Sequence, residues 1–232
     1  MIVDGQLATM VKTVTTWIVP LIFAVTFHEA AHGYVALRFG DDTALRAGRV
    51  SLNPINHIDP LGTILLPLLM LMARAGFFFG YAKPVPVNFG RLKPLRLGMV
   101  LVALAGPATN VVLAIVSALL FLGVGLVPQA GQEWLALNLV NSLKFNAILC
   151  VFNMLPLPPL DGGRVAVGLL PRPLAMPLAR VEPYGMLILM GLFVLSYASA
   201  QVGLGLNILG WLIGVPANWL IRFVLLVTGQ GG

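Results

Sequence analysis

Residues 14–32 read VTTWIVPLIFAVTFHEAAH, an apolar run that ends in two histidines and a glutamate. A mostly apolar stretch of about 20 residues is long enough to cross a bilayer as a helix. Ionisable side chains inside such a helix are costly and therefore indicate a specific role. The stretch predicts a retained first membrane helix, from about Lys12 to Arg38, with polar chemistry in its second half.

The composition extends this prediction to the whole chain. Of the 232 residues, 59% are hydrophobic and only 9% are charged, whereas soluble domains carry roughly 25% charged residues. This excludes a soluble enzyme, a nucleic-acid-binding protein and a disordered protein. The net charge of +6 comes from small basic clusters between apolar runs, as in loops beside a membrane. The single cysteine, Cys150, excludes an intrachain disulfide.

Apolar runs predict an all-α polytopic membrane protein with about five to six transmembrane helices and short extended loop elements. After the first helix, further spans are expected within 97–132 (ending near Pro128), 135–155 and 183–221, the last holding two helices with a turn near Gly203 and Gly205. The run 61–81 contains Pro67 and Gly76, so we expect a re-entrant or broken segment; a sixth full span is the alternative. Residues 1–232 are expected to form a single integral-membrane domain.

The basic residues orient these spans. Cationic residues favour the cytoplasmic side, which places 38–49, 83–96, 164–180 and Arg222 there and leaves Lys12 outside. Lys144 lies within a span and is expected to snorkel toward the interface. The chain is therefore predicted to be a multi-pass protein of the plasma membrane.

The motif His28-Glu29-Ala30-Ala31-His32 carries the chemistry. Residues four apart lie above one another on a helix face, so His28 and His32 can bind one Zn²⁺ together. Glu29, beside that face, is suited to take a proton from the bound water. The alternative is a hydrated helix end at the interface, but Arg38 follows ten residues later, which puts His28 about 15 Å deep by helix rise.

A catalytic zinc site needs a third protein ligand. The candidates are Asp161, Asp59, His57, Asp41 and Asp42. We favour Asp161, because the prolines before it forbid a continuous helix and an extended chain can bring it back to the metal in the cytoplasmic half of the membrane. Alternatively, Asp161 is a helix N-cap paired with Arg164. Asp59 precedes Pro60, which is typical of a turn or helix start.

Three further stretches accompany the HEAAH motif: GYAKPVPVN (80–88), GPATN (106–110) and NMLPLPPLDGG (153–163). With HEAAH, they resemble the site-2 protease family of intramembrane zinc metallopeptidases over nearly the whole chain, in its compact prokaryotic branch without PDZ or CBS domains. The resemblance implies His28, His32 and Asp161 as zinc ligands and Glu29 as the catalytic base. It places Asn153 beside the metal as a second catalytic residue, which helps bind or polarise the substrate. It also makes Asn110 an interhelical polar contact.

The expected function is that of an intramembrane zinc metalloprotease with one Zn²⁺ ion. Its partners would be the lipid bilayer and a transmembrane protein or peptide, cleaved within or next to a membrane-spanning segment. An extended substrate could add as a strand to an edge at Val50–Leu52 or Val85–Val87. The alternative is a metal-binding or metal-transporting membrane protein without protease activity.

Overall fold

The protein is built from helices. The computed structural model describes residues 2–65, 83–201, 203, 205 and 207–231. Its α-helices there are α1 (Ile2–Arg38), α2 (Thr43–Arg46), α4 (Leu95–Phe121), α5 (Gln129–Asn153), α6 (Asp161–Leu169), α7 (Arg172–Ala179), α8 (Glu182–Gln201) and α9 (Val215–Val227). Short 3-10 or π-helical turns cover Pro54–His57, Pro60–Leu65, Phe89–Arg91, Val124–Leu126 and Gly210–Gly214. No strand occurs among the described residues, which confirms the all-α class.

Five helical segments of the described chain are long and apolar enough to cross a membrane. They are Thr9–Arg38, Leu95–Phe121, Gln129–Asn153, Glu182–Ser199 and Gly210–Val227. This finding confirms the polytopic architecture. The predicted re-entrant or broken segment 61–81 lies mostly outside the described residues, which include only its first turn, within Pro60–Leu65.

The boundaries of several spans differ from the predicted ones. α1 begins at Ile2 and not near Lys12, and α9 ends at Val227 and not near Ile221. α4 ends at Phe121, and α5 begins at Gln129, before the predicted start at Leu135. Hydropathy locates the apolar part of a helix, whereas the first turn of α5 is polar and includes Gln132. The turn expected near Gly203 and Gly205 is present, and both residues have positive φ angles (74° and 63°), which favour glycine.

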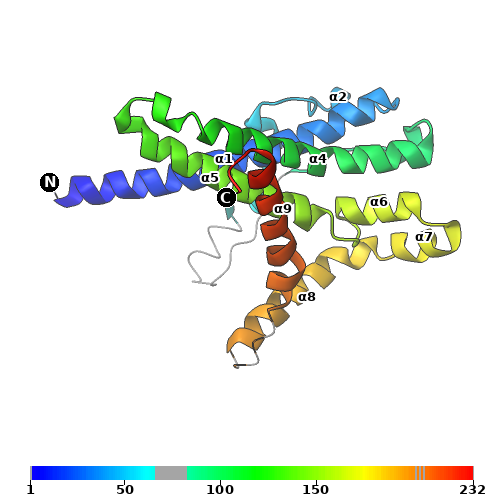
Figure 1. Ribbon diagram of the computed structural model, residues 1–232. Coiled ribbons are helices and arrows are strands. Elements are labelled where there is room, and N and C mark those ends of the chain that lie inside the picture. The colour runs from blue at the N-terminus through cyan, green and yellow to red at the C-terminus, as the bar shows by residue number, and fades with distance from the viewer. Residues whose placement is uncertain (1, 66–82, 202, 204, 206, 232) are drawn as a thin grey trace.

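Helices α1, α4 and α5 pack against one another and form the central bundle (Figure 1). α6 packs on α4, and α9 packs on α5 and α4. α8 points away from the bundle in Figure 1. Small side chains such as Ala114 and Ala118 are fully buried against Leu143 and Val224, and small residues let helices in a membrane approach closely. The three-helix bundle therefore provides the packing surface for α2, α6 and α9.

Polar contacts join α1 to the beginning of α5. Lys12 forms an ion pair with Glu133, and the indole Nε1 of Trp134 donates to Thr15 Oγ1 at 2.9 Å. The cation expected on the non-cytoplasmic side therefore has an acidic partner from the neighbouring helix.

Asp41 fixes the chain after α1 to the extended segment 83–88. It is fully buried. Its Oδ1 accepts hydrogen bonds from the Thr43 N–H and hydroxyl, and its Oδ2 accepts one from the Asn88 N–H at 2.7 Å. Burial acts to raise the pKa of the Asp41 carboxyl, but the hydrogen bonds from Thr43 and Asn88 outweigh it, so the pKa lies below its ordinary value.

We predict that Asp41→Ala lowers the free energy of unfolding by about 2–3 kcal/mol, because the N–H groups of Thr43 and Asn88 lose a charged acceptor. Asp42→Ala is the matched control. Asp42 forms ion pairs with the exposed Arg46 and Arg91, which are worth about 0–1 kcal/mol. Thermal unfolding in detergent measures both, and equal losses would contradict the assignment.

The lowered pKa of Asp41 also sets the direction of a pH effect. The ionised form is the one stabilised by folding, so its contribution is fully present above the ordinary carboxyl pKa. It disappears as the pH falls through the lowered pKa of the folded state. We expect the stability difference between wild type and Asp41→Ala to shrink in strong acid.

Candidate metal centre

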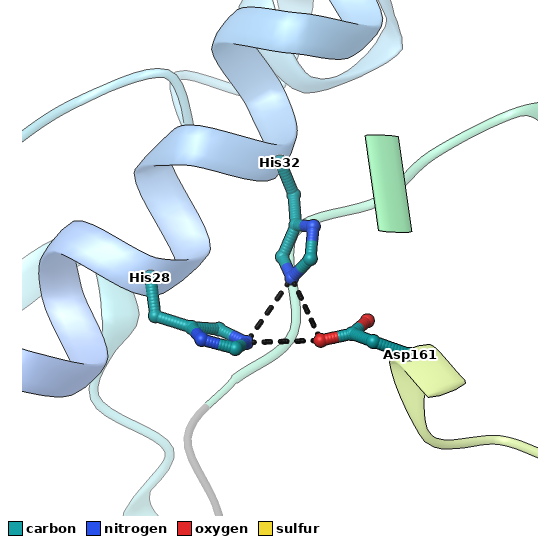
Figure 2. A group of neighbouring side chains, drawn as sticks. All are labelled: His28, His32 and Asp161. Carbon is teal, nitrogen blue, oxygen red and sulfur yellow. Dashed lines mark hydrogen bonds and ion pairs between the residues drawn. The ribbon is translucent and has the colours of Figure 1, made fainter. Parts of the chain in front are cut away.

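His28 and His32 lie one turn apart on α1 and direct their rings to the same point (Figure 2). Their Nε2 atoms are 3.1 Å apart, and both side chains are buried, at 6% and 8% exposure. The helical spacing thus produces the paired imidazoles that the sequence predicts.

Asp161, the first residue of α6, completes the cluster. Its Oδ2 lies 3.2 Å from His28 Nε2 and 3.3 Å from His32 Nε2. No side-chain cap forms at this helix start, where Leu160 is the N-cap residue, and Arg164 pairs with Glu182 instead. The alternative of Asp161 as an N-cap paired with Arg164 is therefore wrong.

The two glycines after Asp161 place it there. A Cβ atom on Gly162 would lie 2.2 Å from the Met154 carbonyl oxygen, and one on Gly163 would lie 2.2 Å from the Pro158 nitrogen. Only glycine lets the start of α6 press directly against the backbone of the proline-rich loop. This packing returns the chain to α1 after the end of α5.

Helix α4 orients both imidazoles. The His28 Nδ1 lies 2.6 Å from Asn110 Oδ1, and the His32 Nδ1 lies 2.7 Å from the Val102 carbonyl oxygen. A carbonyl can only accept, so each Nδ1 is the protonated nitrogen and donates. In the neutral rings both Nε2 atoms then present lone pairs toward the Asp161 oxygen.

Three acceptor atoms without a proton between them form a site for a cation. Asp161 Oδ2 is buried and has no hydrogen-bond donor, although it lies 3.2 Å and 3.3 Å from the two Nε2 atoms. Zinc–ligand distances of about 2.0–2.2 Å in a tetrahedron put neighbouring ligands about 3.4 Å apart. Two imidazoles and a carboxylate at these separations fit zinc, with a position left open, and no other group of three such residues gathers in the described chain.

Gly106 on α4 provides the space for the two rings. A Cβ atom at this position would lie 2.5 Å from His32 Nε2 and 2.6 Å from His28 Nε2. Gly106 and Asn110 are one helical turn apart, so one face of α4 both admits and orients the ligands. Sequence reasoning missed the role of Gly106 and the contact of Asn110 with His28; their one-turn spacing in GPATN was the available signal.

Glu29 lies beside the ligands with one oxygen engaged. Its Oε2 accepts a hydrogen bond from the Val85 N–H at 2.7 Å. Glu29, Val85, Asn153 and the three candidate ligands line one cavity of about 370 Å³. The Asn153 Nδ2 donates to the Leu149 carbonyl of its own helix at 3.0 Å. The predicted base and the predicted substrate-binding amide therefore share a cavity with the candidate metal site.

The other candidate ligands lie in other environments. Asp59 Oδ1 accepts from the N–H groups of Leu61 and Gly62, which makes it a cap at a helix start. The His57 Nε2 is 2.8 Å from the Ser51 carbonyl oxygen, and Asp41 and Asp42 form the contacts described above. None of these four joins the histidine pair.

Comparisons with known proteins find relatives that are named as zinc metalloproteases. The chain is 42% identical over 189 residues to "Putative zinc metalloprotease YwhC" of Bacillus subtilis, covering 78% of this chain and 81% of that protein. "Putative zinc metalloprotease Rip2" of Mycobacterium tuberculosis strain H37Rv is 29% identical over 90% of this chain and 73% of its own length. "Putative zinc metalloprotease MJ0611" of Methanocaldococcus jannaschii is 34% identical over 60% and 62%. No family model and no solved structure matches.

We predict that Gly106→Ala displaces the imidazoles and lowers the zinc content of the purified protein to well below one ion per chain. The new methyl group would overlap both Nε2 atoms. Gly191→Ala is the control, because a Cβ on this α8 glycine meets nothing within 4 Å. Elemental analysis gives the zinc content, and full zinc in Gly106→Ala would refute the packing argument.

Proposed function

We propose, from the premise that this chain belongs to the site-2 protease family of zinc metalloproteases, that it hydrolyses peptide bonds within or next to the transmembrane segments of membrane proteins. The observation that carries the proposal is that His28, His32 and Asp161 converge beside the part of α1 that is long and apolar enough to span a membrane. In this proposal, residues 1–232 act as one integral-membrane metalloprotease domain.

The three ligands would hold one Zn²⁺ ion, which supplies Lewis acidity that lowers the pKa of a water molecule and polarises a carbonyl. Glu29 is the proposed general base. Its Oε2 is held by the Val85 N–H, which fixes the carboxylate and leaves the other oxygen to take the proton of the attacking water. Glu29 then delivers that proton to the leaving amine.

Asn153 is the proposed donor to the oxyanion that develops on the substrate. One N–H of its amide is engaged with Leu149. The other has no partner within the described part of the chain and belongs to a side chain that lines the cavity. A donor fixed in this way loses no freedom when the substrate carbonyl becomes charged.

An unwound substrate would dock along Val85–Val87. This segment belongs to neither a helix nor a strand, and it lines the cavity, whereas Val50–Leu52 does not. Pro84 and Pro86 have no N–H, so Val85 and Val87 supply the only donors of the alternating stretch. The Val85 carbonyl and the Val87 N–H lack partners within the described residues, and a strand can pair with them.

The proposed location is the plasma membrane, with the site in the cytoplasmic half. His28 and His32 lie in the part of α1 nearer Arg38, whereas Lys12 and its partner Glu133 lie at the opposite end of the bundle. Positive residues favour the cytoplasmic side, so water would reach the cavity from the cytoplasm.

A metal transporter is the rival function. It would need further ligands along a path through the spans, and the described residues contain one group of three His, Cys, Asp or Glu side chains that could hold a metal. The cavity also brings a carboxylate and an amide beside that group. Proteolysis needs these groups and simple metal passage does not, so we favour the protease.

We predict that Glu29→Gln retains zinc but lowers cleavage of a membrane-anchored reporter by about 10²–10⁴-fold, the usual contribution of a general base. Glu182→Gln, at an exposed carboxylate, serves as the control. The assay uses the full chain in proteoliposomes, with elemental analysis of the same samples. Unchanged cleavage by Glu29→Gln would exclude Glu29 as the base, and zinc transport without proteolysis in either form would support the rival.

We further predict that Asn153→Ala lowers kcat about 10²–10³-fold with a small effect on KM. A hydrogen bond made mainly to the developing oxyanion contributes to the transition state and little to substrate binding. Steady-state kinetics with a detergent-solubilised peptide separate the two constants. An increase in KM alone would show that Asn153 binds the ground state.

A further inference from the structure

A chain of polar side chains leads from the metal centre into the contact between α4 and α5. Asn110 and Asn146 are 0% and 1% exposed, and both lie in membrane-spanning helices. The Asn110 Nδ2 donates to Asn146 Oδ1 at 2.7 Å, and the Asn146 Nδ2 donates to the Ser142 carbonyl at 2.9 Å. Ser117 on α4 extends the chain, since its hydroxyl lies 2.7 Å from that of Ser142. Buried amides in such a setting are costly unless they are fully paired.

Backbone carbonyls decide which way each amide points. The Ser142 carbonyl can only accept, so the Asn146 atom that faces it is the NH₂ group, and the Asn146 oxygen must face Asn110. The NH₂ group of Asn110 therefore faces the Asn146 oxygen. It also faces the Ala24 carbonyl oxygen, which lies 3.4 Å from the Asn110 Nδ2. The remaining atom of Asn110, its oxygen, is left facing His28 Nδ1.

We infer that Asn146 is a positioning residue of the metal centre, although it is neither one of the proposed ligands nor a residue that lines the cavity. By holding the oxygen of Asn110 toward His28, it keeps the proton on Nδ1 and the lone pair on Nε2, where the metal is bound. If the Asn110 amide turned over, its NH₂ group would face Nδ1, and the proton would move to Nε2. This inference rests on the proposed metal centre.

Asn138 provides a matched comparison on the same helix. It is also buried, at 7% exposure, and its Nδ2 likewise donates to the carbonyl four residues earlier, that of Trp134, at 2.8 Å. Among the described residues, no hydrogen bond joins it to Asn110 or His28. Loss of either amide removes a buried polar group from α5, but only loss of Asn146 removes the 2.7 Å hydrogen bond of the Asn110 NH₂ group and leaves that group with the longer, 3.4 Å contact to the Ala24 carbonyl.

The test measures zinc affinity of the full chain in detergent by competition with a chelator. We expect Asn146→Leu to weaken zinc binding about 10–100-fold, as loss of an outer-shell partner does elsewhere, and Asn138→Leu to retain wild-type affinity. Asn146→Asp should also retain it, because a neutral carboxyl group both accepts from Asn110 and donates to the Ser142 carbonyl. Wild-type affinity in Asn146→Leu, or equal losses in the two leucine variants, would overturn the inference.

A second readout does not depend on zinc or on how the variants fold. In ¹⁵N-histidine spectra of the zinc-free wild type, at a pH where the rings are neutral, His28 should carry its proton on Nδ1. A proton on Nε2 would overturn the inference. If the wild type binds no zinc, the proposed metalloprotease fails, whereas these spectra still show whether His28 has the tautomer that the amide chain requires.

Discussion

The structure depends on three electron-pair donors meeting in a setting with little water. His28, His32 and Asp161 place two nitrogens and one oxygen within 3.1–3.3 Å of one another. Without a cation these atoms repel, and their burial makes that repulsion stronger. Three different helices are therefore needed to hold them together: α1 supplies the histidines, α6 supplies the carboxylate, and α4 fixes the rings.

Helix α4 contributes no ligand, yet it determines the geometry of the centre. Gly106 has no Cβ, which leaves room for both rings. One turn to either side of it, the Val102 carbonyl and the Asn110 side chain accept hydrogen bonds from the Nδ1 atoms of the two rings. Hydrogen bonds of this kind fix the tautomer and raise the basicity of metal-binding histidines. Gly162 has a comparable role at the start of α6. Without a Cβ it can pack against the Met154 carbonyl, and this packing brings Asp161 to α1.

The sequence predicted the parts of this centre that depend on local geometry. The histidine pair follows from helical periodicity, and the spans follow from hydropathy. Asp161 was one of several candidates, because the path of the proline-rich loop depends on backbone contacts at Gly162 that no periodicity reveals. Asn110 was expected to be an interhelical contact; it does contact Asn146 on α5, but its partnership with His28 required knowledge of how α1 and α4 align. The segment 61–81 remains a prediction beyond its first turn.

The remaining question is how the proposed carboxylate base can stay close to a cation without becoming its ligand. Glu29 follows His28 directly, so on a helix its side chain points about 100° away from the histidine face. The Val85 N–H then binds its Oε2 at 2.7 Å. Asp41 holds the other end of the segment 83–88 by accepting a hydrogen bond from the Asn88 N–H. The position of the proposed base therefore depends on a buried carboxylate that follows the end of α1. Helical spacing separates the proposed base from the proposed ligands, and the hydrogen bond from Val85 keeps them apart.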